Sequence, residues 1–375
     1  MTEEGGEEIY GDRSTFMSVT AFLLMGLLLI WAGLNYLNGF WHFMTVDADT
    51  YQITKVILSL FVLLFAVYSF SKGLVTEGIV VMFTGLSSTV FAFGSMFFGV
   101  AGLNRMDALF SIGILLASLL FYGRNRFVAV ASLLLGLTMA VPFLLGYRGE
   151  SLLMGMGLLL SGILFMYYAL GNLLFGETGR NLLRVSQNDR CLNFADDRER
   201  AYVLAIVPGL FTFALLQVLV GLQFVMVTDL SLSYCVAEAL MSAAVIFFAV
   251  YGLSRGVVAE SMMMLIFAVS CFVFSIVALS GAVPSTVIDG LMSVVLLVAG
   301  LVFMYRHDRV LGAGALIFAL GGFLEALFHI YVPAGYLIIA AGLLSLYYSI
   351  DRWVVLETGY RLLSFRWLKV CLRRQ

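Results

Sequence analysis

Charged residues are scarce in this chain. They make up 12 % of its 375 residues, whereas hydrophobic residues make up 62 %. Soluble globular domains carry roughly 25 % charged residues, so this chain has too little polar surface to face water on all sides. The mean hydropathy of +1.03 agrees. The composition excludes a soluble globular protein and predicts a chain that is solvated largely by lipid.

Residues that build catalytic and metal sites are also few. The three histidines (His42, His307 and His329) lie in different predicted spans or loops, and the four cysteines form no CxxC pair. No HExxH, GxSxG, P-loop or dinucleotide-binding motif occurs. We therefore expect no enzyme activity, cofactor, metal site or disulfide framework. The formal net charge of −2 gives no reason to expect nucleic acid as a partner.

Long apolar runs are what the chain does contain. A helix needs about 20 apolar residues to cross a bilayer, and we predict six such spans in each half. The first run follows an acidic N-terminus and is long enough to remain as a helix, so no signal peptide is expected. The sequence predicts an all-α polytopic membrane protein of about twelve transmembrane helices. The predicted spans are 16–40, 51–70, 75–100, 107–121, 126–145, 151–175, 202–225, 233–251, 257–283, 287–304, 310–330 and 333–350.

The first half of the sequence recurs in the second. FAVYSFSKGLVTE at 65–77 returns as FAVYGLSRGVVAE at 248–260, 183 residues later, with Arg255 in place of Lys72. The spacing between matching residues changes only where loops are predicted, as expected after a tandem duplication. The predicted domains are an N-terminal segment (1–15), repeat 1 (16–175), a polar linker (176–200), repeat 2 (201–350) and a basic tail (351–375).

The distribution of basic residues predicts how the chain is oriented. If the N-terminus is cytoplasmic, all but three of the 21 Lys and Arg residues lie on the cytoplasmic side, as membrane proteins prefer. The exceptions are Lys55, Arg105 and Arg148. With six spans per repeat, the two repeats share one orientation and are parallel. We expect a plasma-membrane protein with cytoplasmic termini and with Lys72 and Arg255 as topology anchors.

Polar residues inside predicted spans are candidates for a solute path, because burying them without partners is costly. Asn35 and Gln223 occupy matching positions of the two repeats. They fit either a path that binds a small polar solute or an interhelical hydrogen bond. Lys55 is matched by Glu238. These two charges could form a salt bridge between the repeats, lie at the membrane interface, or each line a vestibule of its own.

A carboxylate and an imidazole lie close together in the eleventh predicted span. Glu325 and His329 are four residues apart, which places them on one face of a helix. The matching residues of repeat 1 are Pro142 and Gly146. The pair is a candidate proton relay, because histidine titrates near neutral pH, or an interfacial pair without function.

Three segments of repeat 1 resemble the acetate uptake transporter family of succinate–acetate permeases. They are the basic glycine turn and the helix after it (71–85), the basic loop and fifth span (121–138), and the end of the sixth span (167–183). LNYLNGF at 34–40 is similar to the end of that family's first helix. The resemblance implies six-span subunits and a path lined by Asn35, Phe83 and Leu137 in repeat 1 and by Gln223 and Leu320 in repeat 2. Because the family forms hexamers, two fused subunits predict a trimer of this chain.

The expected function is a membrane transporter or channel for a small solute, with acetate or another short monocarboxylate first and with proton linkage through Glu325 and His329. Two alternatives stay open. Urea and amide channels have a similar six-span plan, and a non-transporting structural or stress-response membrane protein would use both repeats only for packing. The second repeat has more acidic residues on its outer side, so we expect repeat 1 to be the more anion-competent path. The partners implied are the lipid bilayer, the solute and further copies of the chain.

Overall fold

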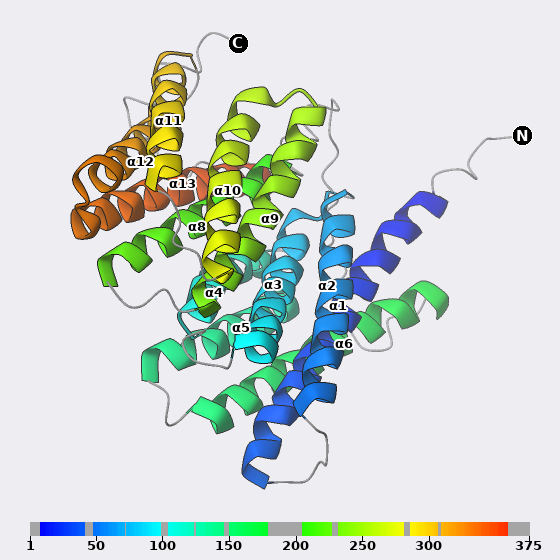
Figure 1. Cartoon of the computed structure of the whole chain (residues 1–375). Coiled ribbons are helices and arrows are strands. Elements are labelled where there is room, and N and C mark those ends of the chain that lie inside the picture. Colours follow the sequence, from blue (N-terminus) through cyan, green and yellow to red (C-terminus); the bar gives the residue numbers. More distant parts are fainter. Residues whose placement is uncertain are drawn as a thin grey trace, which may run out of the picture. The chain divides into compact units, whose positions relative to one another are not determined.

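The computed structural model describes residues 8–41, 48–71, 73–98, 104–123, 125–145, 150–178, 205–226, 232–280, 286–306 and 309–358. Every secondary-structure element in these ranges is a helix (Figure 1). The chain divides into two compact units between Asn193 and Phe194. This division falls inside the predicted linker 176–200, most of which lies outside the described residues.

The described residues of unit 1 form six long helices, and so do those of unit 2. In unit 1 they are α1 (Glu8–Trp41), α2 (Ala48–Ser71), α3 (Val75–Phe98), α4 (Asn104–Tyr122), α5 (Arg126–Leu145) and α6 (Glu150–Thr178). In unit 2 they are α8 (Val207–Met226), α9 (Leu232–Ser254), α10 (Val258–Leu279), α11 (Thr286–Arg306), α12 (Arg309–Phe328) and α13 (Tyr331–Thr358). A helix occupies each of the twelve predicted spans. The first begins earlier than predicted, at Glu8, inside the segment assigned to 1–15.

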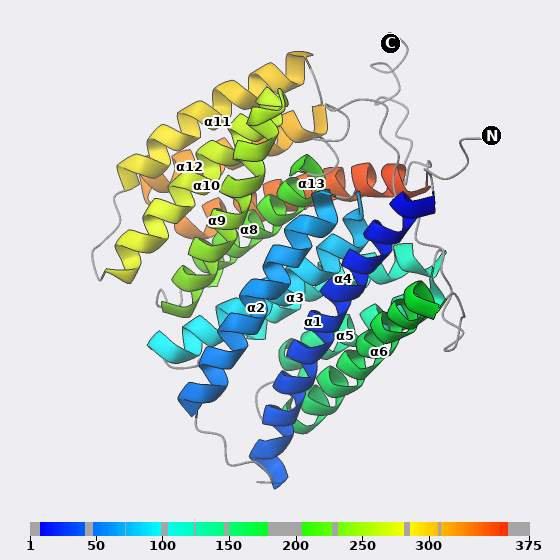
Figure 2. The same cartoon turned by 90° about the vertical axis from the view of Figure 1, so that its right-hand side faces the viewer.

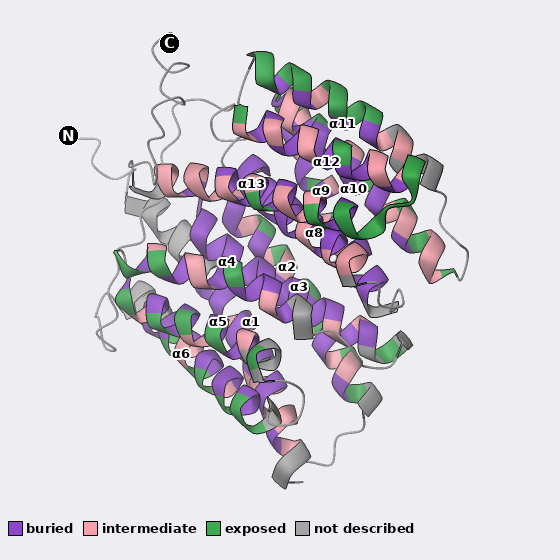
Figure 3. Cartoon of the chain, turned by 90° about the vertical axis from the view of Figure 1, so that its left-hand side faces the viewer, coloured by how far each residue is buried: buried purple, intermediate pink, exposed green. Residues whose placement is uncertain are grey.

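Nine of the described helices are long and apolar enough to cross a membrane. The other three, α4, α5 and α11, have shorter apolar stretches at Asp107–Tyr122, Arg126–Ala140 and Met292–Tyr305. Two of these, α4 and α11, correspond to the short predicted spans 107–121 and 287–304. Large apolar side chains are exposed on many helices, and α11 is largely exposed along its length (Figure 3). These features support a membrane-embedded helical protein, because apolar side chains on the outside of a helix suit lipid better than water.

The same helix pairs pack together inside each unit. In unit 1, α1 packs along α6, α2 along α3 and α4 along α5, and the α1–α6 pair is visible in Figure 2. In unit 2, α8 packs along α13, α9 along α10 and α11 along α12. When the helices are numbered in chain order within each unit, these three pairings are identical.

Glycine allows the α1–α6 and α8–α13 pairs to approach closely. A Cβ atom at Gly33 would lie 2.7 Å from the backbone nitrogen of Leu159 and 2.8 Å from the carbonyl oxygen of Gly155. A Cβ atom at Gly221 would lie 2.8 Å from the backbone nitrogen of Ile339 and 2.8 Å from the carbonyl oxygen of Gly335. Both crossings bring backbone against backbone, as small residues allow between membrane helices.

The repeated basic turn has one backbone conformation in both units. Gly73 and Gly256 have φ angles of 80° and 81°. In unit 1 the Gly73 and Leu74 N–H groups donate to the carbonyls of Phe70 and Ser69, and in unit 2 Gly256 and Val257 donate to Leu253 and Gly252. This hydrogen-bond pattern is the Schellman motif, in which glycine supplies the left-handed residue that ends a helix. The sequence match at 65–77 and 248–260 therefore corresponds to a shared helix end.

Candidate functional sites: a polar cavity in each unit

Unit 1 has a small, partly open cavity of about 30 Å³ between its helices. A site of this kind needs about 10–15 Å³ to hold one water molecule, so the cavity has room for about two. Polar groups reach it from α1, α2, α3 and α4, while α5 and α6 contribute apolar side chains. The lining residues are Leu29, Ala32, Tyr36, Lys55, Thr84, Ser87, Ser88, Phe91, Asp107, Met139, Met154 and Leu158.

Two opposite charges lie in this cavity. The side chains of Lys55 on α2 and Asp107 on α4 are 4 % and 5 % exposed, and their charges interact. The Lys55 ammonium lies over the ring of Phe91, 3.9 Å from its centroid, which is a cation–π contact. The Ser87 hydroxyl on α3 donates a 2.5 Å hydrogen bond to Oδ1 of Asp107. Three neighbouring helices therefore stabilise one buried cation and one buried anion.

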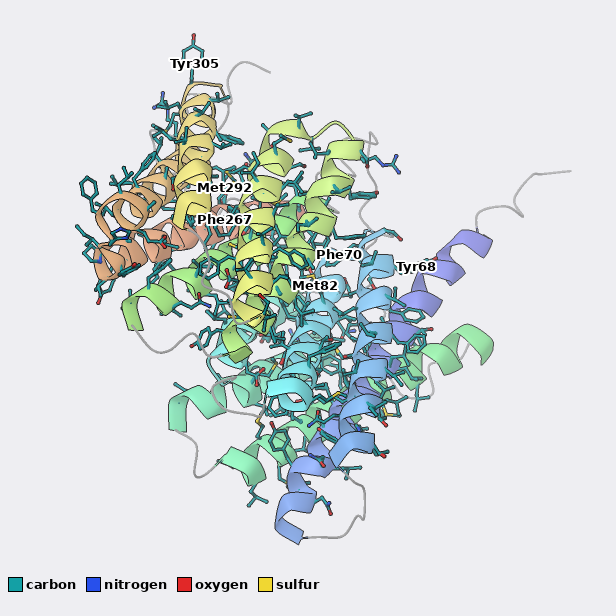
Figure 4. All side chains as sticks on the ribbon, viewed as in Figure 1. Tyr68, Phe70, Met82, Phe267, Met292 and Tyr305 are labelled. Carbon is teal, nitrogen blue, oxygen red and sulfur yellow. The ribbon has the colours of Figure 1, made fainter. Side chains whose placement is uncertain are left out.

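Unit 2 has a partly open cavity of about 40 Å³. Two carboxylates line it, Glu238 on α9 and Glu325 on α12, with 2 % and 4 % of their side chains exposed. The Gln223 amide on α8 donates to Oε2 of Glu238 over 3.5 Å. The lining residues are Val220, Gln223, Phe224, Glu238, Phe267, Ser270, Cys271, Phe274, Met292, Ser293, Phe318, Gly322, Glu325 and Ile338. Phe267 and Met292 are labelled in Figure 4.

The two cavities are built from matching positions of the sequence. At a spacing of 183 residues, six lining residues of unit 1 correspond to six of unit 2: Lys55 to Glu238, Thr84 to Phe267, Ser87 to Ser270, Ser88 to Cys271, Phe91 to Phe274 and Met139 to Gly322. Their charges have diverged. The cavity of unit 1 has one cation and one anion, whereas the described residues around the cavity of unit 2 include two carboxylates and no basic side chain.

Asp107 is the charged residue of the cavity that sequence reasoning did not single out. It is the first residue of the predicted span 107–121, so it resembles an ordinary helix-end charge. Its counterpart in the second repeat is Asp289, because MDALFS at 106–111 recurs as IDGLMS at 288–293, 182 residues later. This recurrence of an acid at matching positions was the available signal. Only the packing of α4 against α3 and α5 shows that the side chain is buried.

The predicted path residues fall into different environments. Gln223 lines the cavity of unit 2. Phe83 is buried and its ring packs against Phe110, at 5.7 Å between centroids, while Asn35 is partly buried beside Tyr51. Leu137 and Leu320 are 50 % and 52 % exposed. These two leucines occupy matching positions on the outward faces of α5 and α12, away from the residues that line the cavities.

The sequence predicts that Glu325 and His329 share one helix face, but in the structure His329 lies beyond the end of the helix. Helix α12 ends at Phe328, and His329 is exposed with a φ angle of 54°, in the left-handed region. Its backbone N–H still donates to the carbonyl of Glu325. The spacing of four implies a shared face only while the helix continues, and here it stops one residue too early.

Lys55 and Glu238 each line the cavity of their own unit. Of the two predicted topology anchors, Arg255 is exposed in the turn after α9 and stacks on Tyr251, with 5.6 Å from the guanidinium carbon to the ring centroid. Lys72 lies outside the described residues.

Among the described residues, no group of three or more His, Cys, Asp or Glu side chains could hold a metal ion. In comparisons with known proteins, no family model, no curated protein and no solved structure matches the chain.

Proposed function

We propose that this chain is a multi-pass membrane transporter or channel for a small polar solute, with acetate or another short monocarboxylate as the first candidate. In this proposal it has twelve spans arranged as two parallel six-helix repeats, lies in the plasma membrane with both termini cytoplasmic, and assembles as a trimer. The repeated sequence, the repeated helix pairing and the two matching cavities support the two-repeat arrangement.

Lys55 in the cavity of unit 1 is the observation on which the solute assignment depends. Charged side chains inside membrane segments are costly and usually line a solute or ion pathway. The ammonium group is buried together with the hydroxyl-bearing side chains of Thr84, Ser87 and Ser88. The hydroxyls of Thr84 and Ser87 already donate to the Val80 carbonyl and to Asp107, so it is the cation that suits a small carboxylate, and the apolar residues around it suit a methyl group.

The cavity of unit 2 supports a different role. Two carboxylates at Glu238 and Glu325 disfavour an anionic solute, so we assign the anion path to unit 1. Glu325 remains the candidate for proton linkage in unit 2. His329 lies beyond the end of α12 and is exposed, so it is not one of the residues that line the cavity.

Uptake into proteoliposomes tests the proposal. Purified protein is expected to take up labelled acetate faster than protein-free liposomes, and faster than it takes up labelled urea. Lys55→Met should reduce acetate uptake by about ten- to a hundredfold, because a charge-assisted contact contributes about 1.5–3 kcal/mol. Lys369→Met, in the basic tail, is the matched control and should transport normally.

Two further outcomes separate the alternatives. Preferential uptake of urea would replace the monocarboxylate assignment by a urea or amide channel. Uptake of neither solute above the protein-free background would overturn the transporter proposal. Because Lys55→Met leaves Asp107 buried without its cation, the double variant Lys55→Met/Asp107→Asn should be measured beside it. The double variant should elute as a folded protein in size-exclusion chromatography. Its acetate uptake should be as low as that of Lys55→Met.

A further inference from the structure

The two charges in the cavity of unit 1 each have a separate close partner. The Lys55 ammonium contacts the face of Phe91 at 3.9 Å, and Asp107 accepts a 2.5 Å hydrogen bond from Ser87. The two charges attract each other, and for Asp107 the hydrogen bond from Ser87 contributes more than the attraction of Lys55. Lys55 can therefore contact a third group, such as the carboxylate of a solute, without first losing its aromatic contact.

A solute carboxylate would upset the charge balance of the cavity. Lys55 and Asp107 together are neutral, so an added anion leaves one net negative charge at a place that is about 95 % shielded from solvent. An uncompensated charge in such surroundings is strongly disfavoured, and a buried group usually becomes neutral instead. A proton that enters with the anion restores neutrality.

We propose that Asp107 accepts this proton, so that unit 1 binds one proton with each monocarboxylate. The inference rests on the proposed function. On binding, an O–H bond forms between the incoming proton and a carboxylate oxygen of Asp107, and the solute carboxylate takes over the attraction of Lys55. No bond of the solute is broken. The Ser87 hydroxyl, which donates to the carboxylate, can rotate to accept from the new acid O–H. Release of the solute returns the proton.

The surroundings of Asp107 favour it as the acceptor. Among the described residues that line the cavity, the titratable groups are Lys55 on α2, Asp107 on α4 and the Tyr36 phenol on α1. The lining residues from α3, α5 and α6 are hydroxyl-bearing or apolar. The residue of unit 2 that matches Asp107 is Asp289, but Lys55 is replaced there by Glu238, so we assign this coupling to unit 1.

Titration calorimetry of the whole purified chain with acetate tests the inference. The measurement is made at one pH in two buffers that differ in ionisation enthalpy, and the difference in heat gives the number of protons taken up. We expect about one proton per acetate for the natural sequence and about none for Asp107→Asn, which should still bind acetate. Asp351→Asn, on α13 and outside both cavities, is the matched control and should take up about one proton.

The outcomes distinguish this inference from the proposed function. Acetate binding by the natural sequence without proton uptake would overturn the role of Asp107 and leave the transporter proposal standing. Proton uptake that persists in Asp107→Asn would assign the proton to another group. Absence of acetate binding to the natural sequence would overturn both. Proton uptake by the natural sequence is measured without any variant. This part of the test can therefore overturn the inference even if Asp107→Asn does not fold.

Discussion

At the scale of single residues, the bond between Ser87 and Asp107 is expected to stabilise unit 1. Asp107 is buried, and the Ser87 hydroxyl donates to its carboxylate at 2.5 Å. Hydrogen bonds to charged groups contribute about 1.5–3 kcal/mol. We predict that Ser87→Ala lowers the free energy of unfolding in detergent by about that amount, measured by thermal or denaturant unfolding.

Ser111 on α4 is the matched control for this prediction. It is also buried, but its hydroxyl donates to the carbonyl of Ala108 in its own helix at 2.6 Å. Ser111→Ala should cost about 1 kcal/mol or less, because no charged acceptor loses its donor. Equal effects of the two substitutions would show that the Ser87–Asp107 bond is not specially stabilising.

At the scale of helices, the glycine crossings are expected to limit which residues the chain tolerates. A Cβ atom at Gly33 or Gly221 would meet backbone atoms of the partner helix at 2.7–2.8 Å. Backbone cannot move aside as a flexible side chain can, so the helices must separate. We predict that Gly33→Ala and Gly221→Ala each lower the free energy of unfolding by about 1–3 kcal/mol, measured in detergent.

Gly314 on α12 provides the control for the crossings. A Cβ atom there would lie 3.6 Å from its nearest neighbours, which is ordinary contact. Alanine has the higher helix propensity, by about 1 kcal/mol, so Gly314→Ala should be neutral or stabilising. A loss of stability at Gly314 equal to that at Gly33 would contradict the explanation by close approach.

At the scale of the whole molecule, the proposed topology predicts which cysteines react in intact cells. Cys191 and Cys371 lie in the predicted cytoplasmic linker and tail, and Cys235 and Cys271 are buried. We predict that a membrane-impermeant maleimide does not label the natural protein until the cells are permeabilised. Gly149→Cys, in the predicted outer loop beside Arg148, should be labelled in intact cells. Labelling of Cys191 before permeabilisation would contradict the cytoplasmic placement of the linker.

The sequence by itself determined the properties that depend on local composition and on the repeat. Helical apolar runs, a helix in each predicted span of the described residues and the shared glycine turn could all be predicted, because lipid solvation and helix ends depend on residues that are close in the chain. The same local reasoning identified Lys55, Glu238 and Gln223 as polar residues inside spans.

Only the tertiary structure decided which of these residues meet. Lys55, Ser87 and Asp107 come from three helices, and no spacing along the chain predicts that they share a cavity. Leu137 and Leu320 matched between repeats, yet both lie on outward faces, and the helix that should have joined Glu325 to His329 ends at Phe328. Side chains from different helices are brought together by packing, which depends on contacts between distant parts of the sequence.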